Sequence, residues 1–363
     1  MKQEFTLILK NIEDSLKEIL PQKTNEKWQN ESFGNLSEFV TDEHFANLIT
    51  PCRTLMDLGG KRWRPLLLVL CSELCRESGK SAPLSLEQTY SITPLVEFVH
   101  TASLIHDDIE DSSKERRGKP AAYLTYGLDT ALNAGSWLYF LAPLVINKLN
   151  ASEKFKNQLY MLYTQELRRL HLGQAMDIFW HRNPTLFPTV QEYTQMVHLK
   201  TGTLASLAVQ TGFLAGGATV EETASAGKIA AALGEGFQIL DDVQNLTTGN
   251  PGKKRGDDIV EGKKSLPVLL HIQEKPEDKK IIASLFEQAS KEGIDSPAVE
   301  KCISILENNN SIEKAAKKGK ETIEKNTAAL SDIFKSANSS KSAKLIEELF
   351  SSMILKFQSK KKD

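Results

Sequence analysis

The chain has 363 residues, of which 40% are hydrophobic and 25% are charged, and its formal net charge at pH 7 is −2. These values are ordinary for a globular protein with a sizeable core, and the sequence lacks the basic stripe interleaved with aromatics that marks nucleic-acid-binding proteins. The four cysteines lack zinc-type spacing, so we expect free thiols in a reducing compartment.

The N-terminal segment predicts a cytoplasmic protein. Its amphipathic pattern is interrupted by Glu13, Asp14 and Glu18, whereas a signal peptide has an uninterrupted apolar core. The longest strongly apolar stretch, residues 137–146, is roughly half of the ~20 residues needed to span a bilayer. We therefore expect no transmembrane helix.

Apolar residues recur at three- and four-residue spacing along most of the chain, for example over residues 66–74, 95–105 and 159–167. This is the period of an α-helix, and the sequence shows no sustained two-residue alternation of the kind typical of strands. The fold is therefore predicted to be all-α.

Turn residues separate the predicted helices without dividing the chain into domains. The breaks fall at residues 59–60, 118–120, 183–184, 216–217, 249–252 and 275–276. None is a long Ser- or Gly-rich linker, so a single domain over residues 1–363 is expected. Its core would cover about 50–275, with a helical lead-in at 1–50 and a peripheral helical part at 277–363.

The first acidic cluster, residues 107–111, reads Asp-Asp-Ile-Glu-Asp. On a helix, His100, Ser103, Asp107 and Asp111 stand at i, i+3, i+7 and i+11 and share one face. Asp107 and Asp111 are then close enough to hold metal ions against a diphosphate. A solvent-exposed acidic helix end is the alternative for this cluster taken alone.

The second acidic cluster, residues 241–245, reads Asp-Asp-Val-Gln-Asn and repeats this geometry, because Gln238, Asp241 or Asp242, and Asn245 share a helix face. Hard cations such as Mg²⁺ take one or two carboxylates together with phosphate oxygens. Two acidic faces pointing into a helical bundle would be severely desolvated without counter-ions. The pair therefore predicts a magnesium-diphosphate site.

Basic residues stand beside these clusters. Lys61, Arg62 and Arg64 follow two glycines, and Arg116 and Arg117 follow the first acidic cluster. Arginine presents a fork of donors suited to phosphate oxygens, and lysine a point charge. Two basic groups suggest two anions, one held by magnesium and one directly by side chains, as in an enzyme that joins two diphosphate esters. A solvated turn is the alternative for the arginine pair.

Residues 55–270 carry a series of motifs in this order: Gly60-Lys61-Arg62-Trp63-Arg64-Pro65, His100, the first acidic cluster, Arg116-Arg117-Gly118, Gly173-Gln174-Ala175-Met176-Asp177, Lys200-Thr201, and Phe237-Gln238-Ile239-Leu240 leading into the second acidic cluster. In order and spacing, these motifs resemble those of the trans-isoprenyl diphosphate synthases. The resemblance implies a single-domain helical bundle around a deep central cavity, usually a homodimer. It implies an enzyme that condenses isopentenyl diphosphate with dimethylallyl, geranyl or farnesyl diphosphate.

The resemblance also implies roles for individual residues. Two or three Mg²⁺ ions would be bound by Asp107, Asp108, Asp111, Asp241 and Asp242. The allylic diphosphate would be contacted by Arg116, Lys200, Lys254 and Lys263. Isopentenyl diphosphate would be held by Lys61, Arg64, His100 and Arg117. The groups beside the developing allylic cation would be the Thr201 hydroxyl, the Lys200 carbonyl and Gln238.

Three polar residues would support the site without touching substrate: Gln174, Asp177 and Asn245. Asn245 stands where the family commonly has aspartate, so it keeps an oxygen ligand but loses a charge. The same ending occurs in the eukaryotic-type geranylgeranyl diphosphate synthases, which this chain also resembles.

Product length is expected to depend on the side chains below the first acidic cluster. Ala102 and Ser103 are small, whereas members of the family that make fifteen-carbon products usually have an aromatic ring there. Tyr139 and Phe140 match an aromatic pair that closes the cavity of eukaryotic-type geranylgeranyl synthases. A twenty-carbon product is predicted, with medium- or long-chain polyprenyl and farnesyl diphosphate as alternatives. The alternative for the two aromatics is simple core packing.

Two other classes of protein are disfavoured. A class I terpene cyclase does not need the second anion site, and its Asn-x-x-x-Ser-x-x-x-Glu metal triad appears nowhere in the sequence. A non-catalytic subunit of a heteromeric synthase typically lacks the acidic ligands, and both clusters are present here.

Overall fold

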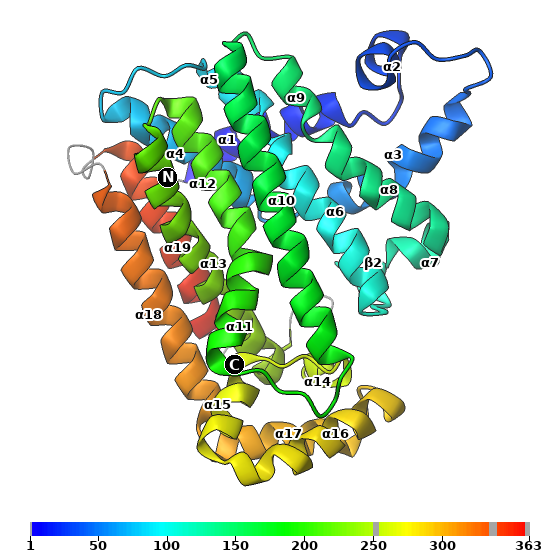
Figure 1. Ribbon diagram of the computed structural model, residues 1–363, viewed down its shortest axis with the longest axis vertical. Coiled ribbons are helices and arrows are strands. Elements are labelled where there is room, and N and C mark those ends of the chain that lie inside the picture. The colour runs from blue at the N-terminus through cyan, green and yellow to red at the C-terminus, as the bar shows by residue number, and fades with distance from the viewer. Residues whose placement is uncertain (1, 250–253, 334–339, 360–363) are drawn as a thin grey trace. The chain divides into compact units, whose positions relative to one another are not determined.

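The computed structural model of the protein describes residues 2–249, 254–333 and 340–359. These residues form α-helices joined by mostly short loops, and the predicted all-α fold is confirmed (Figure 1). One two-stranded antiparallel hairpin pairs Glu115 with Pro120. Of the predicted break at 249–252, residues 250–252 lie outside the described part of the chain.

The chain divides into two compact units, which are described separately. Unit 1 takes the described residues of 1–165, 207–224 and 339–345, and unit 2 those of 166–206, 225–338 and 346–363. The predicted organisation as one domain stays a prediction. Four helices carry residues of both units: α10 (Glu153–His181), α12 (Thr203–Gly216), α13 (Val220–Thr247) and α19 (Lys341–Ser359).

Unit 1 is built around helix α4, which is apolar on nearly every side, as expected of a helix inside a core. The other elements of this unit are α1 (Lys2–Ile19), α2 (Glu26–Phe33), α3 (Asp42–Asp57), α4 itself (Trp63–Glu77), α5 (Leu86–Ser91), α6 (Pro94–Glu110), β1 (Glu115–Arg116), β2 (Lys119–Pro120), α7 (Ala122–Tyr126), α8 (Leu128–Leu141) and α9 (Leu144–Asn147). Within the expected lead-in, α1 contributes the fully buried Ile12 and Leu16 and contacts α4 and α6.

Unit 2 has its own apolar core. Its elements are α11 (Val190–Val197), the π-helical turn η1 (His198–Gly202), α14 (Asp257–Val260), α15 (Leu266–Glu274), the 3₁₀ turn η2 (Pro276–Asp278), α16 (Lys279–Glu292), α17 (Pro297–Asn308) and α18 (Ser311–Asp332). The core cluster includes Val243, Phe286 and Ile303, so α16 and α17, from the part expected to be peripheral, contribute to it.

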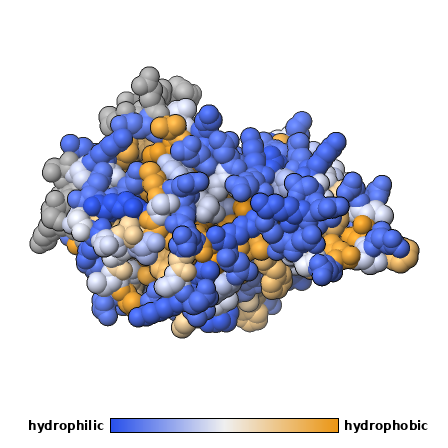
Figure 2. Space-filling view, turned by 90° about the horizontal axis from the view of Figure 1, so that it is seen from above, coloured by the Kyte–Doolittle hydropathy of each residue, from blue (hydrophilic) through white to orange (hydrophobic). Residues whose placement is uncertain are grey.

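Hydrophilic side chains predominate on the face of the molecule that Figure 2 shows, interrupted by smaller hydrophobic patches. Among the described residues, no helix is long and apolar enough to cross a membrane. All four cysteines are free and buried.

Candidate active site

The first acidic cluster ends helix α6 in unit 1. The helix begins with Pro94 at its first turn and stops at Asp111, because Ser112 adopts a φ of 55°. Asp107 and Asp111 are therefore one turn apart at the C-terminal end, while Asp108 is buried. Carboxylates are unfavourable at this end, where the helix dipole is negative, so the cluster favours a cation.

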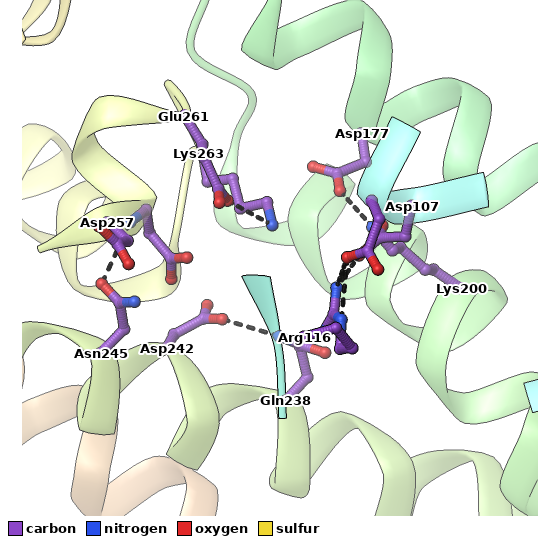
Figure 3. Close-up of polar contacts among 12 residues, drawn as sticks. Asp107, Arg116, Asp177, Lys200, Gln238, Asp242, Asn245, Asp257, Glu261 and Lys263 are labelled. Atoms are coloured by element: carbon purple, nitrogen blue, oxygen red, sulfur yellow. Dashed lines mark hydrogen bonds and ion pairs between the residues drawn. The ribbon is translucent and has the colours of Figure 1, made fainter. Parts of the chain in front are cut away.

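Arg116 on strand β1 partly neutralises this cluster. Its Nε and Nη2 donate to Asp108 Oδ1 at 2.9 and 2.5 Å, and Nη2 lies 3.6 Å from Asp107 Oδ2 (Figure 3). Burial opposes the charge of Arg116, but the attraction of Asp108 outweighs it and raises the guanidinium pKa. Asp107, Asp108 and Arg116, predicted to share the allylic diphosphate site, thus lie together.

Arg62 has a structural role in the basic motif before α4. It adopts a φ of 46° and turns inward, where its Nε and Nη1 donate to Glu13 and Glu97 at 2.6 and 2.7 Å. Its Nη2 donates to the Met56 carbonyl at 2.6 Å. Removing one partner from a buried ion pair costs about 3–5 kcal/mol, so Arg62 fixes the start of α4.

Arg64, His100 and Arg117 form the predicted basic group of unit 1. Burial lowers the pKa of Arg64 to about 10, so it stays protonated at pH 7, and among the described residues its Nε has no hydrogen-bond partner. Burial also lowers the pKa of His100 well below its usual value, and the charges of Arg64 and Arg117 lower it further. A neutral imidazole beside two guanidinium groups is a set of donors suited to an anion. Lys61, the fourth predicted member, is exposed.

The two aspartates of the second cluster, on α13 in unit 2, differ in exposure. Asp241 is exposed, whereas Asp242 is buried. Asp242 Oδ2 accepts hydrogen bonds from the Tyr193 hydroxyl at 2.6 Å and the Leu266 main-chain nitrogen at 3.3 Å, and Oδ1 accepts one from Gln238 Nε2 at 3.0 Å. Burial raises the pKa of Asp242 to about 6, although the bonds from Tyr193 and Gln238 lower it. Asp241 is thus the more accessible of the two predicted metal ligands.

Asn245 is fully buried and supports the loop before α14. Its Oδ1 accepts from the Asp258 main-chain nitrogen at 3.2 Å, and its main-chain oxygen accepts from Gly256 at 3.0 Å (Figure 3). Its Nδ2 has no hydrogen-bond partner among the described residues. These contacts agree with the expected supporting role, which stays a prediction.

Lys200 and Thr201 lie in the π-helical turn η1, a feature often found at functional sites. Lys200 Nζ donates to Asp177 Oδ2 at 2.6 Å, and Thr201 Oγ1 donates to Gln238 Oε1 at 2.8 Å. A side chain at Gly173, next to the predicted Gln174, would collide with the main-chain nitrogen of Lys200. Close backbone contact with α10 thus fixes the turn that presents both predicted catalytic residues.

The two remaining lysines predicted at the allylic diphosphate, Lys263 and Lys254, form ion pairs within unit 2. Lys263 Nζ lies 2.8 Å from Glu261, and Lys254 Nζ lies 3.7 Å from Asp295. The second pair is mostly exposed, so it is weak and leaves Lys254 able to exchange partners.

The predicted chain-length residues of unit 1 differ in burial. Ala102 is fully buried and Ser103 is half-buried, with its hydroxyl donating to the His100 carbonyl at 2.8 Å. Tyr139 is buried and stacks on His106 with ring centroids 5.5 Å apart, whereas Phe140 is 79% exposed in the single chain. A floor made by both aromatics stays a prediction.

Lys264 was not predicted from the sequence, because a lysine beside Lys263 is normally solvated. It is only 4% exposed, with its Nζ 4.7 and 5.0 Å from the ring centroids of Phe286 and Phe187 and donating to the Gly262 carbonyl at 2.9 Å. Burial lowers its pKa to about 8, although Asp177 raises it. No sequence signal distinguishes it from its neighbour.

Replacing Lys264 with Met should change the pH dependence of stability. Lowering a lysine pKa from 10.5 to about 8 corresponds to roughly 3 kcal/mol at neutral pH, because the unfolded chain then binds the proton more tightly. This cost is complete below pH 8 and disappears as the pH rises towards 10.5. The free energy of unfolding of Lys264→Met relative to wild type should therefore fall between pH 7 and 10, measured by urea titration. The exposed Lys279→Met, beside the same Phe187 ring, is the control; a difference for Lys264→Met that is independent of pH would contradict the prediction.

Within the described residues, no three acidic, histidine or cysteine side chains converge closely enough to form a metal site by themselves. The predicted ligands Asp107 and Asp111 belong to unit 1, and Asp241 and Asp242 to unit 2.

A family model described as polyprenyl synthetase matches residues 46–306. The chain belongs to the polyprenyl synthetase family. The geranylgeranyl pyrophosphate synthase penG of Penicillium ochrochloron is 35% identical over 251 residues, which are 69% of this chain and 66% of that protein. A geranylgeranyl pyrophosphate synthase of Neocamarosporium betae is 37% identical over 257 residues, 70% of this chain and 68% of that protein. The chain thus spans about two thirds of the length of these relatives.

Among solved structures, the geranylgeranyl pyrophosphate synthetase of Pyrococcus horikoshii Ot3 matches with a TM-score of 0.78 and 25% identity. The match covers 98% of this chain and 99% of that one. The predicted family, the predicted fold and the predicted enzyme class, an isoprenyl diphosphate synthase, are confirmed.

Proposed function

We propose that this polyprenyl synthetase condenses isopentenyl diphosphate with an allylic diphosphate to make geranylgeranyl diphosphate. The observation that carries the proposal is the arrangement of charge along α6. His100, in the basic group with Arg64 and Arg117, stands seven residues before Asp107 of the acidic cluster, or about 10 Å along the axis. One helix of unit 1 therefore carries an anion site and an acidic site at a separation suited to two diphosphate esters.

Magnesium is the cation that these residues fit best. Asp107, Asp111 and Asp241 offer hard oxygen donors, and Mg²⁺ is commonly held by one or two carboxylates together with phosphate oxygens. The C-terminal end of α6 adds a favourable negative potential. We propose two or three ions, bound by these three residues with Asp108 and Asp242. When bound, they neutralise the leaving diphosphate as the carbon-oxygen bond breaks.

The protein side chains bind the two anions and face the reacting carbon. The allylic diphosphate is bound by Arg116, Lys200, Lys254 and Lys263. Isopentenyl diphosphate is bound by Lys61, Arg64, His100 and Arg117. The Thr201 hydroxyl, the Lys200 carbonyl and Gln238 place partial negative charge beside the allylic cation, which the isopentenyl double bond attacks. Released diphosphate takes the proton, so no side-chain base is required.

We propose that the enzyme is a cytoplasmic homodimer. Support comes from helix α8, where Leu128, Leu132 and Phe140 are exposed at spacings of four and eight residues, which places them on one face. Analytical ultracentrifugation tests the dimer: Leu132→Glu should weaken it, and a wild-type monomer at micromolar concentration would contradict it.

Replacing Ala102 with Phe should shorten the products towards fifteen carbons, because the ring would occupy space beside α6 below Asp107. Replacing both Tyr139 and Phe140 with Ala should lengthen the products beyond twenty carbons. Product sizing by mass spectrometry after dephosphorylation measures both shifts.

Ala102 is fully buried, so Ser103→Phe, at a half-buried position, serves as the second shortening variant. A folded double alanine variant with an unchanged product distribution would show that the aromatic pair is not the floor of the cavity. The single Tyr139→Ala and Phe140→Ala variants then show whether the buried ring of Tyr139 or the exposed ring of Phe140 limits product length.

A further inference from the structure

A continuous chain of hydrogen bonds joins Tyr193 to the catalytic turn of unit 2. The Tyr193 hydroxyl donates to Asp242 Oδ2 at 2.6 Å. Gln238 Nε2 donates to Asp242 Oδ1 at 3.0 Å (Figure 3). At the other end of the Gln238 amide, Oε1 accepts from the Thr201 hydroxyl at 2.8 Å. Tyr193 is 2% exposed and comes from α11, whereas Asp242 and Gln238 come from α13.

These hydrogen bonds determine which way the Gln238 side-chain amide points. An ionised carboxylate only accepts hydrogen bonds, so the amide must turn its NH₂ group towards Asp242. Its oxygen then faces Thr201, and the Thr201 hydroxyl must donate to it. The opposite rotamer would place the amide oxygen against the carboxylate and leave Thr201 without this acceptor.

The orientation of the Asp242 carboxylate in turn determines the orientation of the Gln238 amide. The Tyr193 hydroxyl and the Leu266 main-chain nitrogen both bind Oδ2, which leaves Oδ1 facing Gln238. Without the Tyr193 hydroxyl, Asp242 Oδ2 would keep only the Leu266 main-chain donor, in a buried site where water cannot easily replace the lost bond.

We infer that Tyr193 is a positioning residue that orients the oxygen atoms of Gln238 and Thr201 towards the allylic cation, an inference that rests on the proposed function. Tyr193 acts through Asp242 and touches neither substrate. Its contribution is to the transition state, because the oriented oxygens matter once positive charge develops on carbon.

Tyr193→Phe removes only the hydroxyl and should lower kcat about tenfold, with the KM for isopentenyl and farnesyl diphosphate changed less than about twofold. A double-mutant cycle with Thr201→Val measures whether the effects of the two substitutions on kcat are additive. A purely structural role of Tyr193 would leave them additive. If Tyr193 orients the amide, Thr201→Val should cost several-fold less kcat in the Tyr193→Phe background than in wild type.

The control is Tyr163→Phe, which removes another buried tyrosine hydroxyl, one that donates to the Tyr139 carbonyl at 2.5 Å. It should keep the wild-type kcat for total condensation, measured by diphosphate release. If Tyr193→Phe does not fold, as judged by its melting curve, Tyr193→Met replaces it in the cycle, because it also removes the hydroxyl and leaves Asp242, a proposed metal ligand, in place.

An inactive wild type would refute the proposed function. An active wild type with a wild-type kcat for Tyr193→Phe, or with additive effects in the cycle, would overturn the positioning role alone.

Discussion

Replacing Asp241 with Ala should lower kcat by about 10²-fold or more while the protein remains folded. Asp241 is exposed on α13, so its loss removes a proposed metal ligand without opening a cavity. Asp107→Ala, at the C-terminal end of α6, should have the same effect. Steady-state turnover at saturating Mg²⁺ and both substrates measures kcat, and circular dichroism checks the fold.

Glu221 provides a matched control, since it is an exposed carboxylate in the first turn of the same helix as Asp241. Glu221→Ala should turn over at the wild-type rate. Removal of divalent cations with EDTA should abolish wild-type turnover, and added Mg²⁺ should restore it. Near-normal, magnesium-dependent turnover by either aspartate variant would remove that residue from the metal site.

Replacing Arg64 with Ala should raise the KM for isopentenyl diphosphate about tenfold or more and leave the KM for the allylic substrate within about twofold. The guanidinium carbon of Arg64 lies 4.5 Å from the centroid of the Trp63 ring, and its buried Nε has no hydrogen-bond partner among the described residues. A charged donor held in this way is suited to bind one anion.

Arg76→Ala is the control for Arg64, because Arg76 lies on the same helix and donates to the Leu84 carbonyl. It should change neither KM. Equal increases in both KM values for Arg64→Ala would instead indicate one anion site shared by the two substrates.

Features that depend on local periodicity could be predicted from the sequence. The spacing of Asp107 and Asp111 fixes a common helix face in any α-helix, and the apolar pattern around residues 95–105 predicts which side of α6 is buried. The structure has that helix, and it ends at Glu110 with Asp111, the last residue of the cluster, as its C-cap. The helical fold follows from the same pattern repeated along the chain.

Features that depend on contacts between distant residues could not be predicted. The inward turn of Arg62 requires Glu13 and Glu97, 49 and 35 positions away. The buried, hydrogen-bonded state of Asp242, in contrast to the exposed Asp241, depends on Tyr193, which lies 49 positions from Asp242 on another helix. Lys264 is buried because two phenylalanines pack around it, and adjacent lysines in a sequence do not reveal which one will be buried.

The measurement that tests the central claim most directly is the product formed by the purified wild-type protein from isopentenyl and farnesyl diphosphate. We expect geranylgeranyl diphosphate as the main product, formed only when Mg²⁺ is present and identified by mass spectrometry after dephosphorylation. Absence of any elongated prenyl diphosphate under these conditions, or release of a cyclised hydrocarbon, would contradict the account.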